Sequence, residues 1–529
     1  MRPLFAPHAR LIAAVLAALP AALLASAPSP ADEQQSARPT FARRAAPTRE
    51  DTARALHLLE RATWGTRRTE LAEVLRMGRS AWLERQLHPE RIDDGALAAR
   101  IGRFPAAEAT PAELYRDYPR PGQAGRDSAA GRPRQSARPQ RILVDLAGAR
   151  LQSAVYSQRQ LEDVMADFWF NHFNVYFGKG NARYMVGDYE RRAIRPHVFG
   201  RFRDMLGATA AHPAMLVYLD NARSTAADSM RRGPARPAGA RPRGINENYA
   251  RELLELHTLG VDGGYTQNDV VDVARVFTGW TVGMGRGAPR FAFRPALHDA
   301  GAKTVLGKRF PAGRGEEEGE EVLDLLARHP ATARHLAREL ARRFVADEPP
   351  PRLVAELAAV FLRTDGDLRA VTRALFASDE FNATEARGNK VKTPFEFIAG
   401  ALRATDAEVG PSRVTLRTLR ELGHLPYAAT APTGYPNRSA EWASGGAMLA
   451  RMNFALALAA GRVDGVRIDP ARFGAAPEGI AAALLPGRDV AALNATVASE
   501  LERAGSTDPR ARSARALGLV LGSPAFQRR

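Results

Sequence analysis

Apolar residues recur at helical spacing along almost the whole chain beyond residue 50, and this periodicity is the strongest constraint on its fold. Gly and Pro separate the periodic runs. The pattern predicts an all-α protein with one large multi-helix globular domain. The predicted helices cover residues 54–61, 69–77, 79–87, 142–173 with one interruption, 183–208, 210–220, 246–259, 267–279, 319–346 with a break at Pro330, 352–363, 367–377, 391–404, 413–422, 440–460, 487–503 and 511–521.

Strand-like sequence is rare. Residues 290–294 and 303–306 are the segments with strand character. We therefore expect at most one small β-hairpin, formed by these two segments around the loop that joins them.

The N-terminus has the features of an export signal. A basic start is followed by an uninterrupted apolar run over residues 11–24 and by the small residues Ala25, Ser26 and Ala27. The run is shorter than the ~20 residues that a membrane span needs, and no twin-arginine pair precedes it. We predict a signal peptide at 1–31 that uses the general secretory route and a mature protein in the periplasm or outside the cell; the alternative is an uncleaved anchor.

The predicted domain organisation is simple. A linker at 32–49 leads into a single helical domain at 50–529. Two stretches within it, 116–141 and 223–243, are rich in Arg, Pro, Gly and Ser and lack apolar periodicity. Such sequences bury too little apolar surface to offset the entropy of ordering, so we expect flexible insertions there.

Charge at first suggests a nucleic-acid partner, because 75 basic residues face 58 acidic ones, for a net charge of +17. Only five of the basic residues are lysines, which indicates a compositional bias toward arginine. The first 44 residues and the two insertions together hold 13 of the 17 net charges. The helical body is thus close to neutral, and specific nucleic-acid binding is not expected.

Several kinds of chemistry are excluded by residues or motifs that the sequence lacks. There is no cysteine, so disulfides, thiolate catalysis, iron–sulfur clusters and cysteine zinc sites are ruled out. The chain also has no P-loop, Gly-x-Ser-x-Gly, His-Glu-x-x-His or dinucleotide fingerprint. No cofactor is indicated.

The densest group of polar residues lies at 246–260, which we expect to be one helix. Glu252 and Glu255 are one turn apart on its polar stripe, and His257 lies on the flank of its apolar stripe. Two carboxylates this close suit acid–base work or metal ligation, because like charges raise one of the two pKa values. The alternative is structural: the glutamates cap neighbouring helices and bind arginines.

Two further candidates lie elsewhere in the chain. His172 continues the apolar stripe of its helix, a position typical of a hydrogen-bonded core residue, with a role as ligand or base as the alternative. His298 and Asp299 are neighbours on a Gly- and Ala-rich loop, where such a pair can orient a base or bind a metal if the two side chains meet.

These same segments resemble a bacterial family catalogued as domain of unknown function 1800. The resemblance covers about residues 50–527, and its most specific part is Asn-Glu-Asn-Tyr-Ala-Arg-Glu-Leu-Leu-Glu-Leu-His-Thr-Leu-Gly at 246–260. It implies a mostly helical, exported domain whose genes often accompany a second, sulfatase-like exported family. The family brings no activity, cofactor or catalytic residue with it. The other matching segments are 58–65, 168–173, 264–266, 274–280, 298–299, 434–436 and 523–527.

Two functions remain open from the sequence. The first is an exported accessory or binding protein, with another exported protein as a possible partner. The second is an extracytoplasmic hydrolase or metal-dependent enzyme whose site combines Glu252, Glu255, His257, His172, His298 and Asp299.

Overall fold

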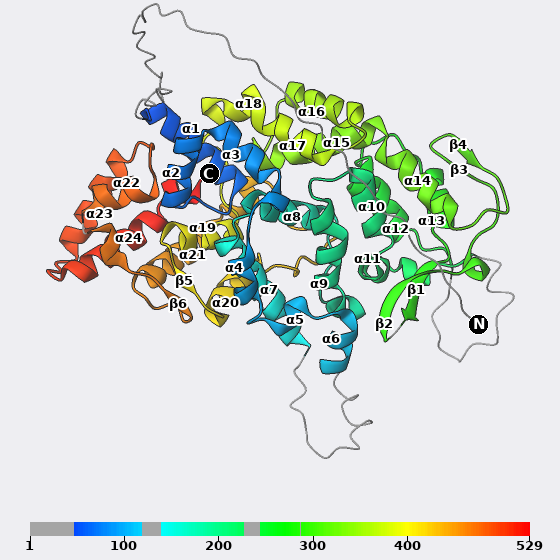
Figure 1. Cartoon of the computed structure of the whole chain (residues 1–529), viewed down its shortest axis with the longest axis horizontal. Coiled ribbons are helices and arrows are strands. Elements are labelled where there is room, and N and C mark those ends of the chain that lie inside the picture. Colours follow the sequence, from blue (N-terminus) through cyan, green and yellow to red (C-terminus); the bar gives the residue numbers. More distant parts are fainter. Residues whose placement is uncertain (1–46, 119–138, 227–243, 286, 475) are drawn as a thin grey trace, which may run out of the picture. The chain divides into compact units, whose positions relative to one another are not determined.

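The structure is a computed structural model that describes residues 47–118, 139–226, 244–285, 287–474 and 476–529. Residues Pro47–Arg529 form one compact unit. Helices make up most of it, and in the described ranges strands pair only in three small two-stranded antiparallel sheets (Figure 1). The prediction of a largely all-α fold is confirmed.

The helices fall into three consecutive stretches of the chain. The first stretch contains α1 Arg49–Ala62, α2 Arg68–Met77, α3 Arg79–Gln86, α4 Gly95–Ile101, α5 Pro105–Glu108, α6 Pro111–Asp117, α7 Gln140–Tyr156 and α8 Gln160–His172. The second contains α9 Val186–Tyr189, α10 Phe202–Ala210, α11 Pro213–Tyr218, α12 Asn248–Glu252, α13 Gln267–Val276, α14 Glu317–Ala327, α15 Pro330–Phe344, α16 Pro351–Arg363, α17 Leu368–Ala377 and α18 Asp379–Asn382. The third contains α19 Pro394–Ala404, α20 Arg413–Glu421, α21 Gly445–Ala459, α22 Pro477–Leu484, α23 Ala491–Arg503, α24 Pro509–Gly522 and α25 Pro524–Gln527.

The predicted single hairpin is wrong in its pairing. Strand β2 (Ala288–Phe293) pairs with β1 (Trp280–Gly285), and β3 (Lys303–Val305) pairs with β4 (Lys308–Phe310). The second pair closes through Leu306 and Gly307, which both have positive φ, as a tight two-residue turn requires. Each of these four strands thus pairs with the strand that is its neighbour in sequence. A third pair joins β5 (Glu408–Val409) to β6 (Val466–Arg467).

The long helix predicted at 183–208 is also wrong. The chain there forms the short α9, a π-helical turn at Glu190–Ile194 and a 3₁₀ turn at Arg195–His197 before α10 begins. Pro196 accounts for part of this break, because it lacks the N–H that a continuous helix needs.

Several predicted segments lie wholly or partly outside the described residues. These include the signal peptide at 1–31, most of the linker at 32–49 and the central parts of both insertions. The described edges of the first insertion are helical, since α6 ends at Asp117 and α7 begins at Gln140, so its predicted boundaries were too wide. No helix in the described ranges is long and apolar enough to span a membrane.

Helix α8 lies at the centre of the fold. Its residues Leu161, Met165 and Phe168 are buried in one continuous apolar core that extends from α1 to α25. The opposite side of α8 is also enclosed, because Asp163 is buried and accepts a hydrogen bond from the Trp64 indole at 2.8 Å. Polar groups on both sides of α8 can therefore be buried inside the protein.

Candidate functional site

Three histidines meet beside the end of α8. The ring centroid of His172 lies 6.2 Å from that of His257 and 6.0 Å from that of His335. His172 ends α8, and His257 lies in a π-helical turn, Leu253–Thr258, that follows α12. His335 comes from α15. The structure thus places two of the candidate histidines side by side and adds a third.

Two of these histidines are held by the π turn. Nε2 of His172 donates to the carbonyl of His257 at 3.1 Å, and Nε2 of His335 donates to the carbonyl of Leu256 at 3.0 Å. These carbonyls belong to the last turn before Gly260, where helical partners run out. A carbonyl only accepts, so each Nε2 carries a proton and the histidines act as caps.

The histidines are neutral at physiological pH. Burial, followed by the proximity of His335, lowers the pKa of His257 to about 3. Burial is also the main reason that the pKa values of His172 and His335 lie below the usual range. No group of three or more His, Asp or Glu side chains in the described ranges is arranged to hold a metal ion.

Glu252 and Glu255 are half-buried and remain accessible. Burial, then the charge of Glu255, raises the pKa of the Glu252 carboxyl. Glu255 lies 3.5 Å from the guanidinium of Arg251. Burial and a hydrogen bond to Glu255 raise the pKa of Tyr265 to about 12. Of the two glutamates, Glu252 has a carboxyl whose pKa is raised, and Glu255 has a carboxyl close to a cation.

His298 and Asp299 belong to a different network. Nδ1 of His298 donates to the Thr278 carbonyl at 2.8 Å, and its Nε2 lies 3.4 Å from a carboxylate oxygen of Glu318, which also pairs with Lys303 at 2.7 Å. Asp299 accepts hydrogen bonds from the guanidinium of Arg275.

No hydrogen bond, ion pair or ring contact recorded for the described residues connects this network to the other candidates. His298 touches Thr278, Phe293 and Glu318, whereas His172 touches α8, the π turn and α15. The six candidate residues therefore do not form one continuous contact network.

A small polar cavity beside α8 was not predicted. It encloses about 20 Å³, room for about one water molecule. Burial raises the pKa of Asp167, although Arg150 counteracts this by donating a 2.8 Å hydrogen bond to it. His424 contributes an imidazole whose buried Nδ1 has no hydrogen-bond partner. The side chains that line the cavity include Arg150, Asp167, Asn171, His424, Tyr427 and Tyr435.

The loop at 425–436 closes this cavity. Asn171 Nδ2 donates to the carbonyl of Tyr435 at 2.8 Å, and the Tyr435 N–H donates back to Asn171 Oδ1 at 2.6 Å. Asn174 donates to the carbonyls of Ala429 and Ala431. Tyr427 has a φ of 64°, which is strained for a tyrosine, and its hydroxyl donates to Glu190. Asn171 sits on the polar stripe of α8, but periodicity cannot indicate which distant loop it binds.

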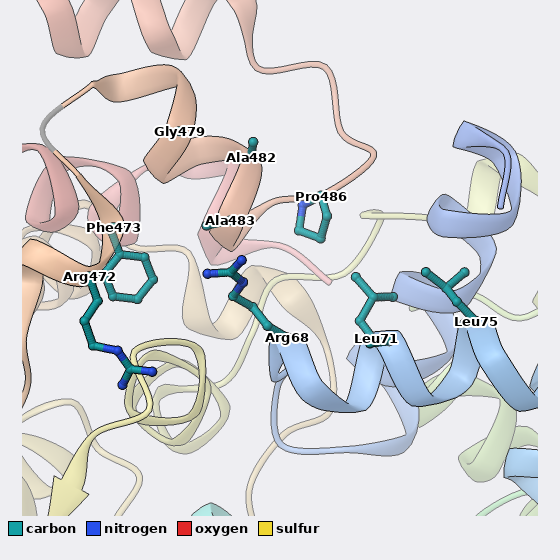
Figure 2. Close-up of a pocket in the computed structure, with 10 residues that line it drawn as sticks. Arg68, Leu71, Leu75, Arg472, Phe473, Gly479, Ala482, Ala483 and Pro486 are labelled. Carbon is teal, nitrogen blue, oxygen red and sulfur yellow. The ribbon is translucent and has the colours of Figure 1, made fainter. Parts of the chain in front are cut away.

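A second concavity is a groove between α2 and α22. It encloses about 380 Å³, within the usual range for ligand sites. Figure 2 shows apolar side chains of both helices along it, with the Arg68 guanidinium between them. None of the six candidate residues lines it. Its walls are Arg68, Leu71, Ala72, Leu75, Arg472, Phe473, Gly479, Ala482, Ala483 and Pro486.

Comparison with known proteins gives a family and no activity. No curated protein and no solved structure matches the chain. The family model described as protein of unknown function (DUF1800) matches residues 57–528, nearly the whole described part. The chain therefore belongs to the DUF1800 family.

Proposed function

We propose that this chain is an exported protein that acts by binding, as an accessory component of an envelope or extracellular process. The observation that carries the proposal is the groove between α2 and α22, a mostly apolar concavity of about 380 Å³. Concave, mostly apolar sites of this size are where proteins commonly bind small molecules.

The contacts of the candidate catalytic residues support binding over catalysis. His172 caps the π turn through its Nε2, and Asp299 is paired with Arg275. His298 is buried with Lys303 and Glu318. Each of these groups already has a role in holding the fold, which leaves few free groups for chemistry.

Export rests on the N-terminal sequence. We expect the full chain to be processed near residues 25–31 and recovered outside the cytoplasm, and a chain that lacks residues 2–31 to stay inside. Cell fractionation with N-terminal sequencing of the recovered protein tests this. A full chain retained unprocessed in the cytoplasm would contradict export.

Binding at the groove can be tested with Nile red, an uncharged dye that becomes fluorescent in apolar surroundings. We expect saturable binding to the folded protein and its loss in Ala483→Trp, which fills the groove beside Arg68. Ala492→Trp, at an exposed alanine of α23, is the control. If the dye does not bind, or if both variants bind it equally, the groove is not a binding site.

The second candidate is an acid–base enzyme that uses Glu252 and Glu255. The raised pKa of Glu252 and the Arg251 guanidinium 3.5 Å from Glu255 favour it, since acid–base catalysis uses carboxyl groups held in unlike environments. Turnover of chromogenic ester, phosphate, sulfate or glycoside substrates should then be lost in Glu252→Gln while Ala483→Trp retains it. Equal turnover in wild type and Glu252→Gln would exclude this site.

A further inference from the structure

The groove contains a cation without a partner. Arg68 is the first residue of α2, and Figure 2 shows its guanidinium inside the groove, turned toward Ala483. It forms no hydrogen bond or ion pair within the described ranges, unlike most of the arginines that lie in those ranges. The second arginine of the groove, Arg472, lies 3.9 Å from a carboxylate oxygen of Asp406 and is therefore partly neutralised. The free positive charge in the groove is that of Arg68.

The rest of the lining offers no side-chain hydrogen bonds. Besides the two arginines, the walls carry only Leu, Ala, Phe, Pro and Gly. A polar ligand, or an extended peptide with an N–H and a C=O at each residue, would lose hydrogen bonds to water there without replacement. The ligand that fits is apolar along its body and charged at one end.

The two ends of the groove differ in charge. The α2 residues that line it run from Arg68 to Leu75, about 10 Å of helix at 1.5 Å per residue. The unpartnered cation lies at the Arg68 end, and Leu71 and Leu75 follow along the wall. A bound chain would place its charged head at Arg68 and its apolar tail toward Leu75.

We propose that the groove binds an anionic hydrocarbon amphiphile, a medium-chain fatty-acid carboxylate, with Arg68 as the residue that binds the carboxylate. The guanidinium presents parallel N–H donors that match the two oxygens of a carboxylate. This inference rests on the proposed binding function and adds its ligand class.

Displacement of Nile red from the full folded protein tests the ligand class. The competitors are hexanoate, octanoate and decanoate below their micelle concentrations, with octanol and octyltrimethylammonium as the neutral and cationic counterparts. Each added methylene should tighten binding about fourfold until the groove is full. Octanoate should bind about five to ten times more tightly than octanol, and octyltrimethylammonium more weakly than both.

Two variants test whether Arg68 binds the carboxylate head group of the ligand. Arg68→Gln should remove the preference for octanoate over octanol and leave octanol binding within twofold, because the apolar walls are unchanged. Arg76→Gln, at an exposed arginine of the same helix outside the groove lining, should leave all affinities unchanged.

The outcomes separate the two proposals. If Nile red binds in the groove but octanoate and octanol compete equally, or Arg68→Gln has no effect, the ligand class is overturned while the binding function stands. If only anionic phospholipid vesicles or apolar peptides displace the dye, the fatty-acid assignment is likewise overturned. If Nile red itself fails to bind, the proposed binding function fails.

Discussion

Six arginines in the described part of the chain are at most 5% exposed, and much of their hydrogen bonding goes to backbone carbonyls. Arg403 illustrates the arrangement. It donates to the carbonyls of Ala154 and Val155, in the last turn of α7, and also to Gly65. Helix C-termini leave such carbonyls without internal partners, so buried guanidiniums here replace water. The six are Arg61, Arg150, Arg343, Arg403, Arg451 and Arg529.

This use of arginine adds to the sequence interpretation, in which the arginine excess indicated only a compositional bias. The bias is real, because lysines are few. The buried members of the set are nevertheless part of the internal hydrogen bonding, which net charge alone cannot reveal.

Arg403→Met should destabilise the protein by about 3 to 5 kcal/mol, because it leaves buried carbonyls and the carboxylate of Glu70 without their donor. Urea denaturation at neutral pH measures the change. Arg413→Met, at an exposed arginine that starts α20, is the control and should change stability by less than about 0.5 kcal/mol. Equal effects of the two substitutions would contradict the capping role.

At the scale of elements, the loop at 425–436 is fixed to α8 by a close backbone approach. Gly434 has a φ of 68°, and a Cβ on it would lie 2.4 Å from the Asn171 side-chain oxygen and 2.5 Å from its carbonyl. Only glycine fits both the conformation and the space.

Gly434→Ala should therefore destabilise the protein more than the same change at Gly423, which has a φ of 76° but no atom within 4 Å of its Cβ position. The Gly423 variant isolates the strain of a positive φ, roughly 1 kcal/mol, and the excess of about 1 to 3 kcal/mol at Gly434 reports the steric overlap with α8. Urea denaturation compares the two. Equal losses would mean that the loop does not depend on this contact.

Helices were predictable from the sequence where the pattern that marks them lies within the helix itself and at its ends. Helices such as α16 and α20 were predicted within one residue, because their apolar periodicity is regular and proline or serine marks their starts. The π turn at Leu253–Thr258 was not predicted, since the same residue spacing fits a regular helix. Helices such as α5 and α22 are too short for an apolar period to be recognised.

At the scale of the whole molecule, sequence could group only those candidate residues that lie close together along the chain. Sequence placed Glu252, Glu255 and His257 together because they share one segment. It could not reveal that His335, between Arg334 and Leu336 on α15, packs against His172, or that His298 joins a separate network. Which distant segments meet depends on tertiary packing, and one sequence contains no direct signal of it.

Buried neutral histidines make the stability of the whole domain sensitive to mild acid. Burial lowers the pKa values of His57, His257 and His424 to about 3, whereas histidines of the unfolded chain titrate near ~6.5. Below about pH 6.5 the unfolded chain therefore binds protons that the folded one does not, and stability falls as the pH drops toward 3.

We expect a loss of roughly 4 kcal/mol between pH 7.5 and pH 5.5 from these three groups together, measured by urea denaturation at each pH. His424→Phe is the matched variant, because this ring stacks on Trp442 and its buried Nδ1 has no hydrogen-bond partner among the described residues. It keeps the stacking and removes one titration, so its loss over the same interval should be smaller by about 1.4 kcal/mol. The same pH dependence in both proteins would show that His424 is protonated in the folded state, and that the cavity beside α8 admits enough water to solvate the charge.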